Sequence, residues 1–175
     1  MKKFELTNEF VTNMFGTKLF RIRALVEFGD VEAGELGGYV EKESNLGHDD
    51  NAWVYGDAQV SGDALVYGNA WVYGNAQVSG DARVCGDARV CGNGDYAYAH
   101  GFGSVNRTTT FFRLKDGGVG VRCGCFYGTL AQFRDKIRET HGETKKAQEY
   151  LMLADLMELR FEEDENEVGN RKYVE

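Results

Sequence analysis

The sequence predicts a mainly β protein built around a triangular parallel β-helix. A strand-pair cap is expected at its N-terminal end, and a hairpin with two helices at its C-terminal end. Three observations predict this fold class. The motif [ND]-A-x-V-x-G occurs seven times without a gap in residues 51–92. Residues 51–68 and 69–86 are identical at 15 of 18 aligned positions. The chain has 23 glycines and no proline, which indicates many tight turns within regular structure.

Each six-residue motif describes one side of a coil. Its Ala and Val lie two residues apart, so both side chains face the same side of a strand, and the intervening residue faces the other side. Gly followed by Asn or Asp provides the corner, because these residue types tolerate left-handed backbone angles. Three successive motifs close one coil, and stacked coils bury Ala and Val that no single motif could bury alone.

This pattern resembles the hexapeptide-repeat left-handed parallel β-helix family, and the resemblance implies the left hand. Spacing alone also fits a right-handed triangular helix of the bactofilin type. Counting back in sixes from Val54 places Leu36, Lys42 and His48 at the Val position. Residues 36–53 are therefore expected to form a degenerate first coil.

Open ends of a β-helix expose strand edges, so the segments before and after the repeats are expected to be caps. Three units are predicted: a β cap over residues 1–35, the β-helix over 36–101 and a ββαα cap over 102–175. In the first unit, residues 3–28 are expected to form a strand pair that turns around Gly16, with its apolar face on the first coil.

The C-terminal cap is expected to begin with a hairpin that turns at Asp116-Gly117-Gly118. A helix follows, N-capped by Thr129 and ended by Gly142. A second helix is expected to start near Thr144, with an apolar stripe broad enough to pack on a partner surface. The charged residues after it are expected to be frayed.

Outward side chains that lie three motifs apart are expected to stack on one side of the β-helix. One side presents Trp53 over Trp71 and Tyr55 over Tyr73, with Arg89 following Trp71. Large aromatic side chains that face outward need cover or a partner. Four occupants fit: the C-terminal helices folded back, a homo-oligomer seam, a foreign protein, or the base of a small nucleotide beside Arg89.

The formal net charge of −8 is unevenly spread. Residues 27–50 carry eight acidic residues against one Lys, and residues 155–175 carry eight against three basic residues. This distribution disfavours direct binding to nucleic-acid phosphates and suits a basic partner, such as a nucleic-acid-binding protein. The candidate acidic surface comprises Asp30, Glu32, Glu35, Asp49 and Asp50.

An enzymatic role is not expected from the repeats. Left-handed β-helix acyltransferases place a catalytic His between subunits of a trimer and cradle coenzyme A in loops that bulge from the coils. Here the seven motifs contain neither an insertion nor a His. Ser61 and Ser79 stack one coil apart with no base at motif spacing to activate them. Cys123 and Cys125 fit alternation along a strand, so neither a metal nor another cofactor is expected.

The repeats are flanked by GGYVEKESNL at residues 37–46 and GCFYGT at residues 124–129. With the tandem motifs, these segments resemble a group of phage and prophage hexapeptide-repeat proteins over about residues 19–130. The resemblance implies phage origin and a location in the host cytoplasm, and it implies no established reaction. The N-terminus lacks the apolar segment of a signal peptide, and no apolar run is long enough to cross a membrane, which also favours the cytoplasm.

The function predicted from the sequence is non-enzymatic binding and assembly. The protein is expected to self-associate as a dimer or trimer and to engage a host protein, with host-defence inhibition as one outcome. One alternative is a sponge for a small nucleotide-like ligand, and another is a hexapeptide-repeat acyltransferase.

Overall fold

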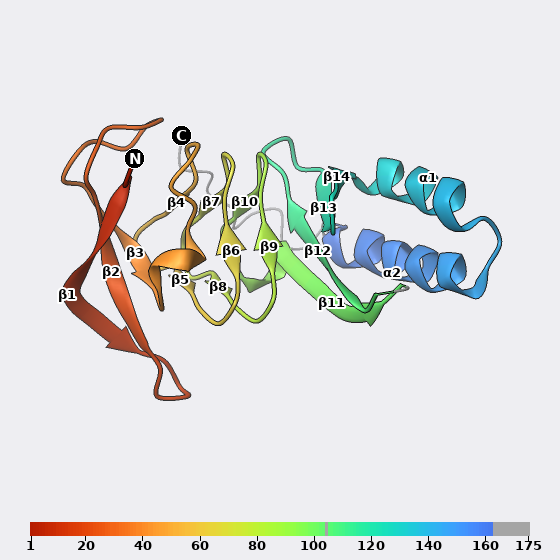
Figure 1. Cartoon of the computed structure of the whole chain (residues 1–175), viewed down its shortest axis with the longest axis horizontal. Coiled ribbons are helices and arrows are strands. Elements are labelled where there is room, and N and C mark those ends of the chain that lie inside the picture. The colour runs from red at the N-terminus through yellow and green to blue at the C-terminus, as the bar shows by residue number, and fades with distance from the viewer. Residues whose placement is uncertain (104, 163–175) are drawn as a thin grey trace.

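The computed structural model describes residues 1–103 and 105–162. A central stack of short parallel strands lies between two antiparallel sheets, and two helices lie beyond the second sheet (Figure 1). The predicted class, a mainly β chain with a repeat solenoid and two C-terminal helices, is confirmed.

Seven two-residue strands form the solenoid. They are β4 (Trp53–Val54), β5 (Gln59–Val60), β6 (Leu65–Val66), β7 (Trp71–Val72), β8 (Gln77–Val78), β9 (Arg83–Val84) and β10 (Arg89–Val90). Strands that lie three motifs apart pair in parallel, so β4, β7 and β10 form one stack, β5 and β8 a second, and β6 and β9 a third. The predicted period of three motifs per coil is therefore confirmed.

The interior of the solenoid is lined by the Ala and Val of the repeated motif. All 14 of these side chains, from Ala52 to Val90, are no more than 1% exposed. This burial confirms the predicted interior. Apolar transfer of about 25 cal/mol per Å² makes it the main stabilising term of the solenoid.

The corners require glycine. Gly56, Gly62, Gly68, Gly74, Gly80 and Gly86 all have φ between 57° and 70°. A Cβ atom on Gly68 would also lie 2.9 Å from the backbone nitrogen of Gly86, so this corner leaves no space for a side chain. At one corner the side chains form a hydrogen-bonded ladder, with Asn51 donating to Asn69 at 3.3 Å and Asn69 to Asp87 at 3.5 Å.

The predicted phase of the first coil is wrong. Val40 pairs with Val60, and Leu46 bridges to Val66. In each pair the two residues are 20 positions apart, two more than the strict period of 18. The corner after Leu46 is longer by the same two positions, and it includes Asp50 in the left-handed region at φ 63°. Val40 and Leu46 thus take the buried Val position that counting in sixes assigns to other residues.

The three displaced residues, Leu36, Lys42 and His48, face outward or into the cap. The Leu36 side chain is exposed, and Lys42 Nζ lies 2.7 Å from Asp63 Oδ1. The His48 ring stacks on Phe4 with 4.4 Å between ring centroids. A longer corner changes the phase of everything before it, so a strict six-residue count cannot be extended across it.

The outward-facing residues of each coil donate hydrogen bonds in one direction. Their backbone N–H groups bind the Ala and Val carbonyls of the following coil, as in Trp53 to Ala70 and Leu65 to Ala82. The Ala and Val carbonyls of the first coil therefore need donors from the N-terminal cap. The outward N–H groups of the last coil need acceptors from the C-terminal cap, because buried groups of either kind require a partner.

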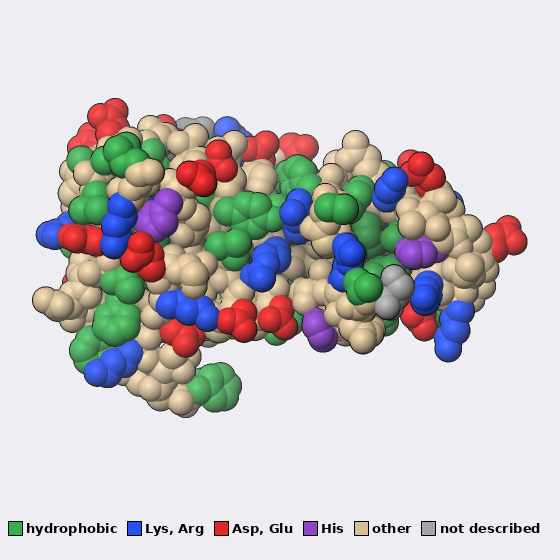
Figure 2. Space-filling model, in the orientation of Figure 1, with side chains coloured by type: hydrophobic (Ala, Val, Ile, Leu, Met, Phe, Trp, Pro, Cys, Tyr) green, Lys and Arg blue, Asp and Glu red, His purple; other side chains and the backbone are tan. Residues whose placement is uncertain are grey.

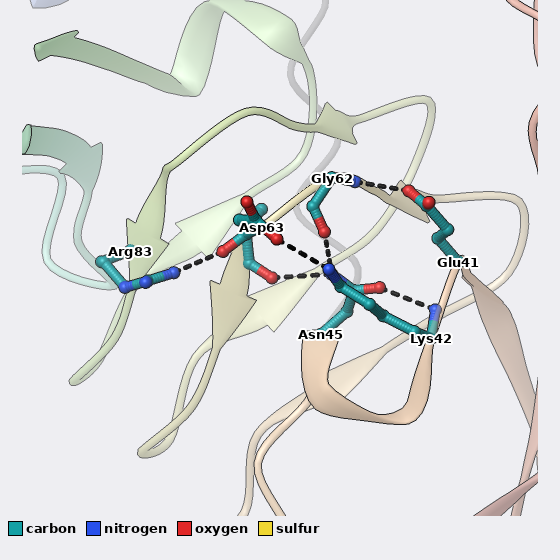
Figure 3. Close-up of polar contacts among 7 residues, drawn as sticks. Glu41, Lys42, Asn45, Gly62, Asp63 and Arg83 are labelled. Carbon is teal, nitrogen blue, oxygen red and sulfur yellow. Dashed lines mark hydrogen bonds and ion pairs between the residues drawn. The ribbon is translucent and has the colours of Figure 1, made fainter.

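Side-chain donors satisfy carbonyls at the N-terminal end. The buried Lys3 ammonium donates to the carbonyls of Asp50 at 3.2 Å and Ala52 at 2.8 Å. The fully buried Asn45 amide donates to the carbonyls of Gly62 at 3.0 Å and Ala64 at 2.8 Å (Figure 3). Both side chains thus supply N–H donors to backbone carbonyls at this end.

Side-chain acceptors satisfy N–H groups at the C-terminal end. The carboxylate of the buried Asp95 accepts from the backbone N–H of Cys91 at 3.0 Å and of Gly92 at 3.2 Å. Asn93 Oδ1 accepts from the N–H of Gln77 at 2.7 Å, and Thr110 Oγ1 from the N–H of Arg83 at 2.9 Å. Each end also binds groups of the other kind: the Gly62 N–H donates to Glu41 Oε2 at 2.6 Å near the N-terminal end, and the Tyr96 hydroxyl donates to the Gln77 carbonyl at 2.6 Å near the C-terminal end.

The N-terminal cap is a sheet that continues into the solenoid. β1 (Phe4–Thr12) and β2 (Lys18–Ala24) pair antiparallel, as predicted, and β3 (Leu36–Val40) joins β2 to β5. Ile22 and Ala24 are buried against the solenoid core. The short helix η1 (Glu43–Asn45) then carries the chain to the first corner.

The C-terminal cap contains more β structure than predicted. After η2 (Asn93–Asp95), β11 (Tyr96–Phe102), β12 (Arg107–Arg113), β13 (Val119–Cys123) and β14 (Phe126–Thr129) form one antiparallel sheet in chain order. The predicted hairpin is its β12–β13 pair. The first helix, α1 (Leu130–His141), is N-capped by Thr129 and ends at Gly142, as predicted.

The second helix, α2 (Lys145–Phe161), is N-capped by Thr144. Its apolar stripe packs with α1 and the sheet in a core of its own, around Phe111, Phe133 and Tyr150. The predicted frayed tail falls on residues 163–175, outside the described part of the chain. In the described part, neither helix has both the length and the apolarity that crossing a bilayer requires.

Replacement of Val72 by Asp is expected to destabilise the fold by more than about 3 kcal/mol, because an unpaired carboxylate would enter an interior lined by Ala and Val. Gln77→Asp is the matched control, since Gln77 faces solvent on the neighbouring strand, and its expected cost is within about 1 kcal/mol. Urea unfolding measures both. Equal stabilities would show that the interior is wrongly assigned.

Burial lowers the pKa of Lys3 from 10.5 to about 8, against the attraction of Asp50 and Asp49. Between these two values the unfolded chain holds a proton that the folded chain has released. The free energy of unfolding, taken relative to Lys3→Met, is therefore expected to rise by up to about 2 kcal/mol from about pH 8 to about pH 10.

Urea unfolding of both proteins across this pH range measures the difference. Tyrosine titration occurs in both proteins and cancels. A difference that stays flat or falls would contradict the burial of Lys3.

Candidate functional site

Trp53 does not lie on an open surface. It pairs with Trp71 between β4 and β7, as predicted, but its side chain is 0% exposed. Phe4 and Phe28 cover it, with ring centroids 6.2 Å and 5.3 Å from the Trp53 ring. The prediction that Trp53 takes part in a partner surface is therefore wrong, because the N-terminal cap occupies that position.

The other aromatic residues of this side remain partly exposed. Arg89 lies over the Trp71 ring, with the guanidinium carbon 4.2 Å from the ring centroid, and donates to the carbonyl of Asn69 at 2.8 Å. Tyr55 packs edge-on against Trp71 at 5.3 Å. Burial raises the pKa of Tyr55 to about 12. Tyr73 is half-buried on the next coil.

The C-terminal helices do not fold back over this side. They pack on the C-terminal sheet at the far end of the molecule (Figure 1). Of the four predicted occupants, this one is excluded. Contact with a second copy of the chain, with a foreign protein or with a nucleotide stays a prediction. The residues concerned are Trp71, Tyr55, Tyr73 and Arg89.

The predicted acidic residues lie around the N-terminal end in two groups. Asp30 and Glu35 lie close enough to Tyr55 to help raise its pKa. Asp49 and Asp50 are exposed at the long corner and interact with Lys3. Glu32 is exposed beside Glu35, whose side chain accepts from the Glu32 backbone at 3.1 Å.

A groove that the sequence did not predict lies between the solenoid and the C-terminal sheet. β6 and β9 form one wall with Leu65, Tyr67 and Arg83, and β12 and β13 add Arg107 and Arg122. The remaining lining residues are Asp81, His100, Thr108 and Gly124. We call this the arginine groove; its volume is about 540 Å³. Figure 2 shows basic and hydrophobic side chains side by side over this junction.

Most of the positive charge in the arginine groove is not neutralised locally. Within residues 1–103 and 105–162, neither Arg107 nor Arg122 forms an ion pair. Arg83 donates to the backbone carbonyl of Asp63, whose carboxylate binds Lys42 instead (Figure 3). Asp81 is the acidic residue of the lining. On a chain of net charge −8, this is a local reversal of sign.

Tyr67 provides an aromatic surface next to these cations. It is half-buried, and the Arg122 guanidinium carbon lies 5.9 Å from its ring centroid. Burial, and then a hydrogen bond with Cys85, raises the pKa of Tyr67 to about 12. Burial also raises the pKa of the Cys85 thiol. Both groups are therefore neutral at physiological pH and do not repel an anion.

The arginine groove offers little catalytic chemistry. His100 Nδ1 lies 2.8 Å from Thr108 Oγ1, yet in the described part of the chain no carboxylate hydrogen-bonds to the other ring nitrogen. A His–hydroxyl pair without an orienting acid lacks the geometry of a catalytic triad. Residues 1–103 and 105–162 contain no cluster of three His, Cys, Asp or Glu side chains that could hold a metal.

The arginine groove was missed because its walls come from distant parts of the sequence. The three-motif period places Leu65 over Arg83 on one side of the solenoid, and alternation places Tyr67 beside Leu65. Arg107 and Arg122 join them because β12 docks beside β9, where the Thr110 hydroxyl accepts from the Arg83 backbone. The available signal was the presence of two arginines on adjacent strands of an acidic chain. The sequence did not show where these strands lie relative to the solenoid.

Comparison with known proteins agrees with the repeat architecture. A family model described as YdcK Beta solenoid repeat matches residues 58–74 and again residues 76–92. These matches fall on the central coils and leave both caps unmatched. No curated protein sequence matches the chain.

Trp53→Ala is expected to lower the free energy of unfolding by about 3–5 kcal/mol, because a fully buried indole would leave a cavity beneath Phe4 and Phe28. Trp71→Ala, one coil away in the same stack, is the matched variant and is expected to cost about 1–2 kcal/mol, since Trp71 is partly exposed. Urea unfolding compares them. An equal or larger cost for Trp71 would contradict the covered position of Trp53.

Proposed function

We propose that this protein is a non-catalytic binding protein whose β-solenoid holds an anionic ligand in the arginine groove. The observation that carries the proposal is the convergence of Arg83, Arg107 and Arg122 on one groove, two of them without an ion pair to any described residue. Guanidinium groups bind phosphate and carboxylate through paired hydrogen bonds, which favours an acidic ligand here.

The scaffold supports this role because both walls of the groove are regular structure. One wall is the hydrogen-bonded stack of β6 and β9, and the other is the C-terminal sheet. The backbone positions of the lining residues are therefore fixed before a ligand arrives, which reduces the entropy lost on binding. The acyltransferase alternative has less support, because the arginine groove provides no His with an orienting acid among the described residues.

The proposal also includes the shape and hand of the solenoid, the phage origin and the partners that the sequence predicts. Each coil has three strands, which supports a triangular cross-section, and the family resemblance supports a left-handed helix. The resemblance to phage and prophage proteins supports action in a host cytoplasm. Self-association and capture of a host protein would use the partly exposed residues of the aromatic side, which are Trp71, Tyr55, Tyr73 and Arg89.

The double variant Arg107→Gln, Arg122→Gln is expected to bind pyrophosphate at least about tenfold more weakly than the wild type, because it loses two charge-assisted contacts. Isothermal titration calorimetry at low salt measures the affinity. Arg138→Gln is the control, since the Arg138 side chain is exposed on α1, outside the groove lining, and its replacement is expected to leave binding unchanged. No pyrophosphate binding by the wild type, or equal loss in the control, would refute the proposal.

A further inference from the structure

The arginine groove combines cations with an aromatic wall, a combination that a bare anion does not require. We propose that its ligand is a nucleoside phosphate, whose base lies against Tyr67 and Arg122 and whose phosphates bind Arg83 and Arg107. This inference rests on the proposed function and names the ligand class for that site.

The composition of the lining supports a ligand with two chemically different parts. Leu65 and Tyr67 form an apolar and aromatic surface along the β6 side of the solenoid. Arg83 and Arg107 present guanidinium groups from β9 and β12 in the same groove. A volume of about 540 Å³ is in the range of small-ligand sites and is larger than one phosphate needs.

Tyr67 and Arg122 form a surface suited to a planar ring. The guanidinium carbon of Arg122 lies 5.9 Å from the centroid of the Tyr67 ring. Nucleobases stack on tyrosine rings and on guanidinium planes, and this interaction tolerates different bases. A free inorganic anion would make no use of this surface.

The charge of the rest of the molecule favours a small ligand over a nucleic-acid strand. The chain carries a net charge of −8, and exposed acidic residues occupy its N-terminal end. A long phosphate backbone that left the arginine groove would meet this negative field, whereas a mononucleotide fits within the groove. Asp81 at the lining further limits how much negative charge the site accepts.

Calorimetry on the full chain separates base recognition from phosphate recognition. The probes are ADP, GDP, CDP and UDP, with ribose 5-phosphate and pyrophosphate as ligands that lack a base. At least one nucleoside diphosphate is expected to bind about tenfold or more tightly than pyrophosphate, in line with the usual strength of base stacking. A short oligonucleotide that binds more tightly than every mononucleotide would overturn the small-ligand assignment.

Variants of Tyr67 test the role of the ring. Tyr67→Leu is expected to weaken nucleotide binding about tenfold while pyrophosphate binding stays unchanged, and Tyr67→Phe is expected to keep the nucleotide affinity. Tyr98→Leu, an exposed tyrosine on β11, is the control and is expected to have no effect. Melting curves show whether each variant is folded; if Tyr67→Leu is not, the Tyr67→Phe result and the ligand comparison decide.

The outcomes distinguish this inference from the proposed function. Equal affinity for pyrophosphate and every nucleotide, unaffected at Tyr67, would overturn the nucleotide assignment and leave an anion site. Binding of none of these probes would overturn both.

Discussion

The structure depends on one constraint: the outward-facing residues of every coil donate their backbone hydrogen bonds toward the C-terminal end. The first coil is therefore left with Ala and Val carbonyls that no earlier coil can bind, and the last coil with N–H groups that no later coil can accept. Where the caps bury these groups, side chains of the caps must bind them. Lys3 and Asn45 supply donors at one end, and Asp95 and Thr110 supply acceptors at the other. Capped ends of this kind also block growth by coil stacking, which open strand edges would otherwise promote.

The same constraint positions the candidate site. The Thr110 hydroxyl that accepts from Arg83 belongs to β12, so the strand that ends the ladder also brings a second sheet beside the solenoid. Arg107 and Arg122 arrive with that sheet and line one groove with the outward side chains of β6 and β9. The arginine groove is thus a consequence of how the last coil is terminated. At the opposite end, the cap that supplies Lys3 also supplies Phe4, which covers Trp53 and removes it from the surface.

The repeats could be predicted from the sequence because each position has one environment. Ala and Val recur every six residues and are all buried, and the glycine corners share one backbone conformation. Prediction failed where an interaction is not periodic. A corner lengthened by two residues moved Leu36, Lys42 and His48 out of the interior. Trp53 repeats Trp71 in sequence, but the N-terminal cap covers Trp53 and leaves Trp71 partly exposed. The arginine groove joins strands from distant parts of the chain, and no local pattern reports their contact.

Exchange of the Asn45 amide for a carboxylate tests the central claim most directly. Asn45→Asp keeps the shape of the side chain and the oxygen that accepts from the Lys42 backbone, but it replaces the donor that faces the carbonyls of Gly62 and Ala64 with an anionic acceptor. Asn75→Asp is the matched control, because Asn75 is exposed at a corner where the motif accepts either residue. Urea unfolding at neutral pH is expected to show a loss of more than about 3 kcal/mol for Asn45→Asp and a change within about 1 kcal/mol for Asn75→Asp. Equal stability of the two variants would contradict the account.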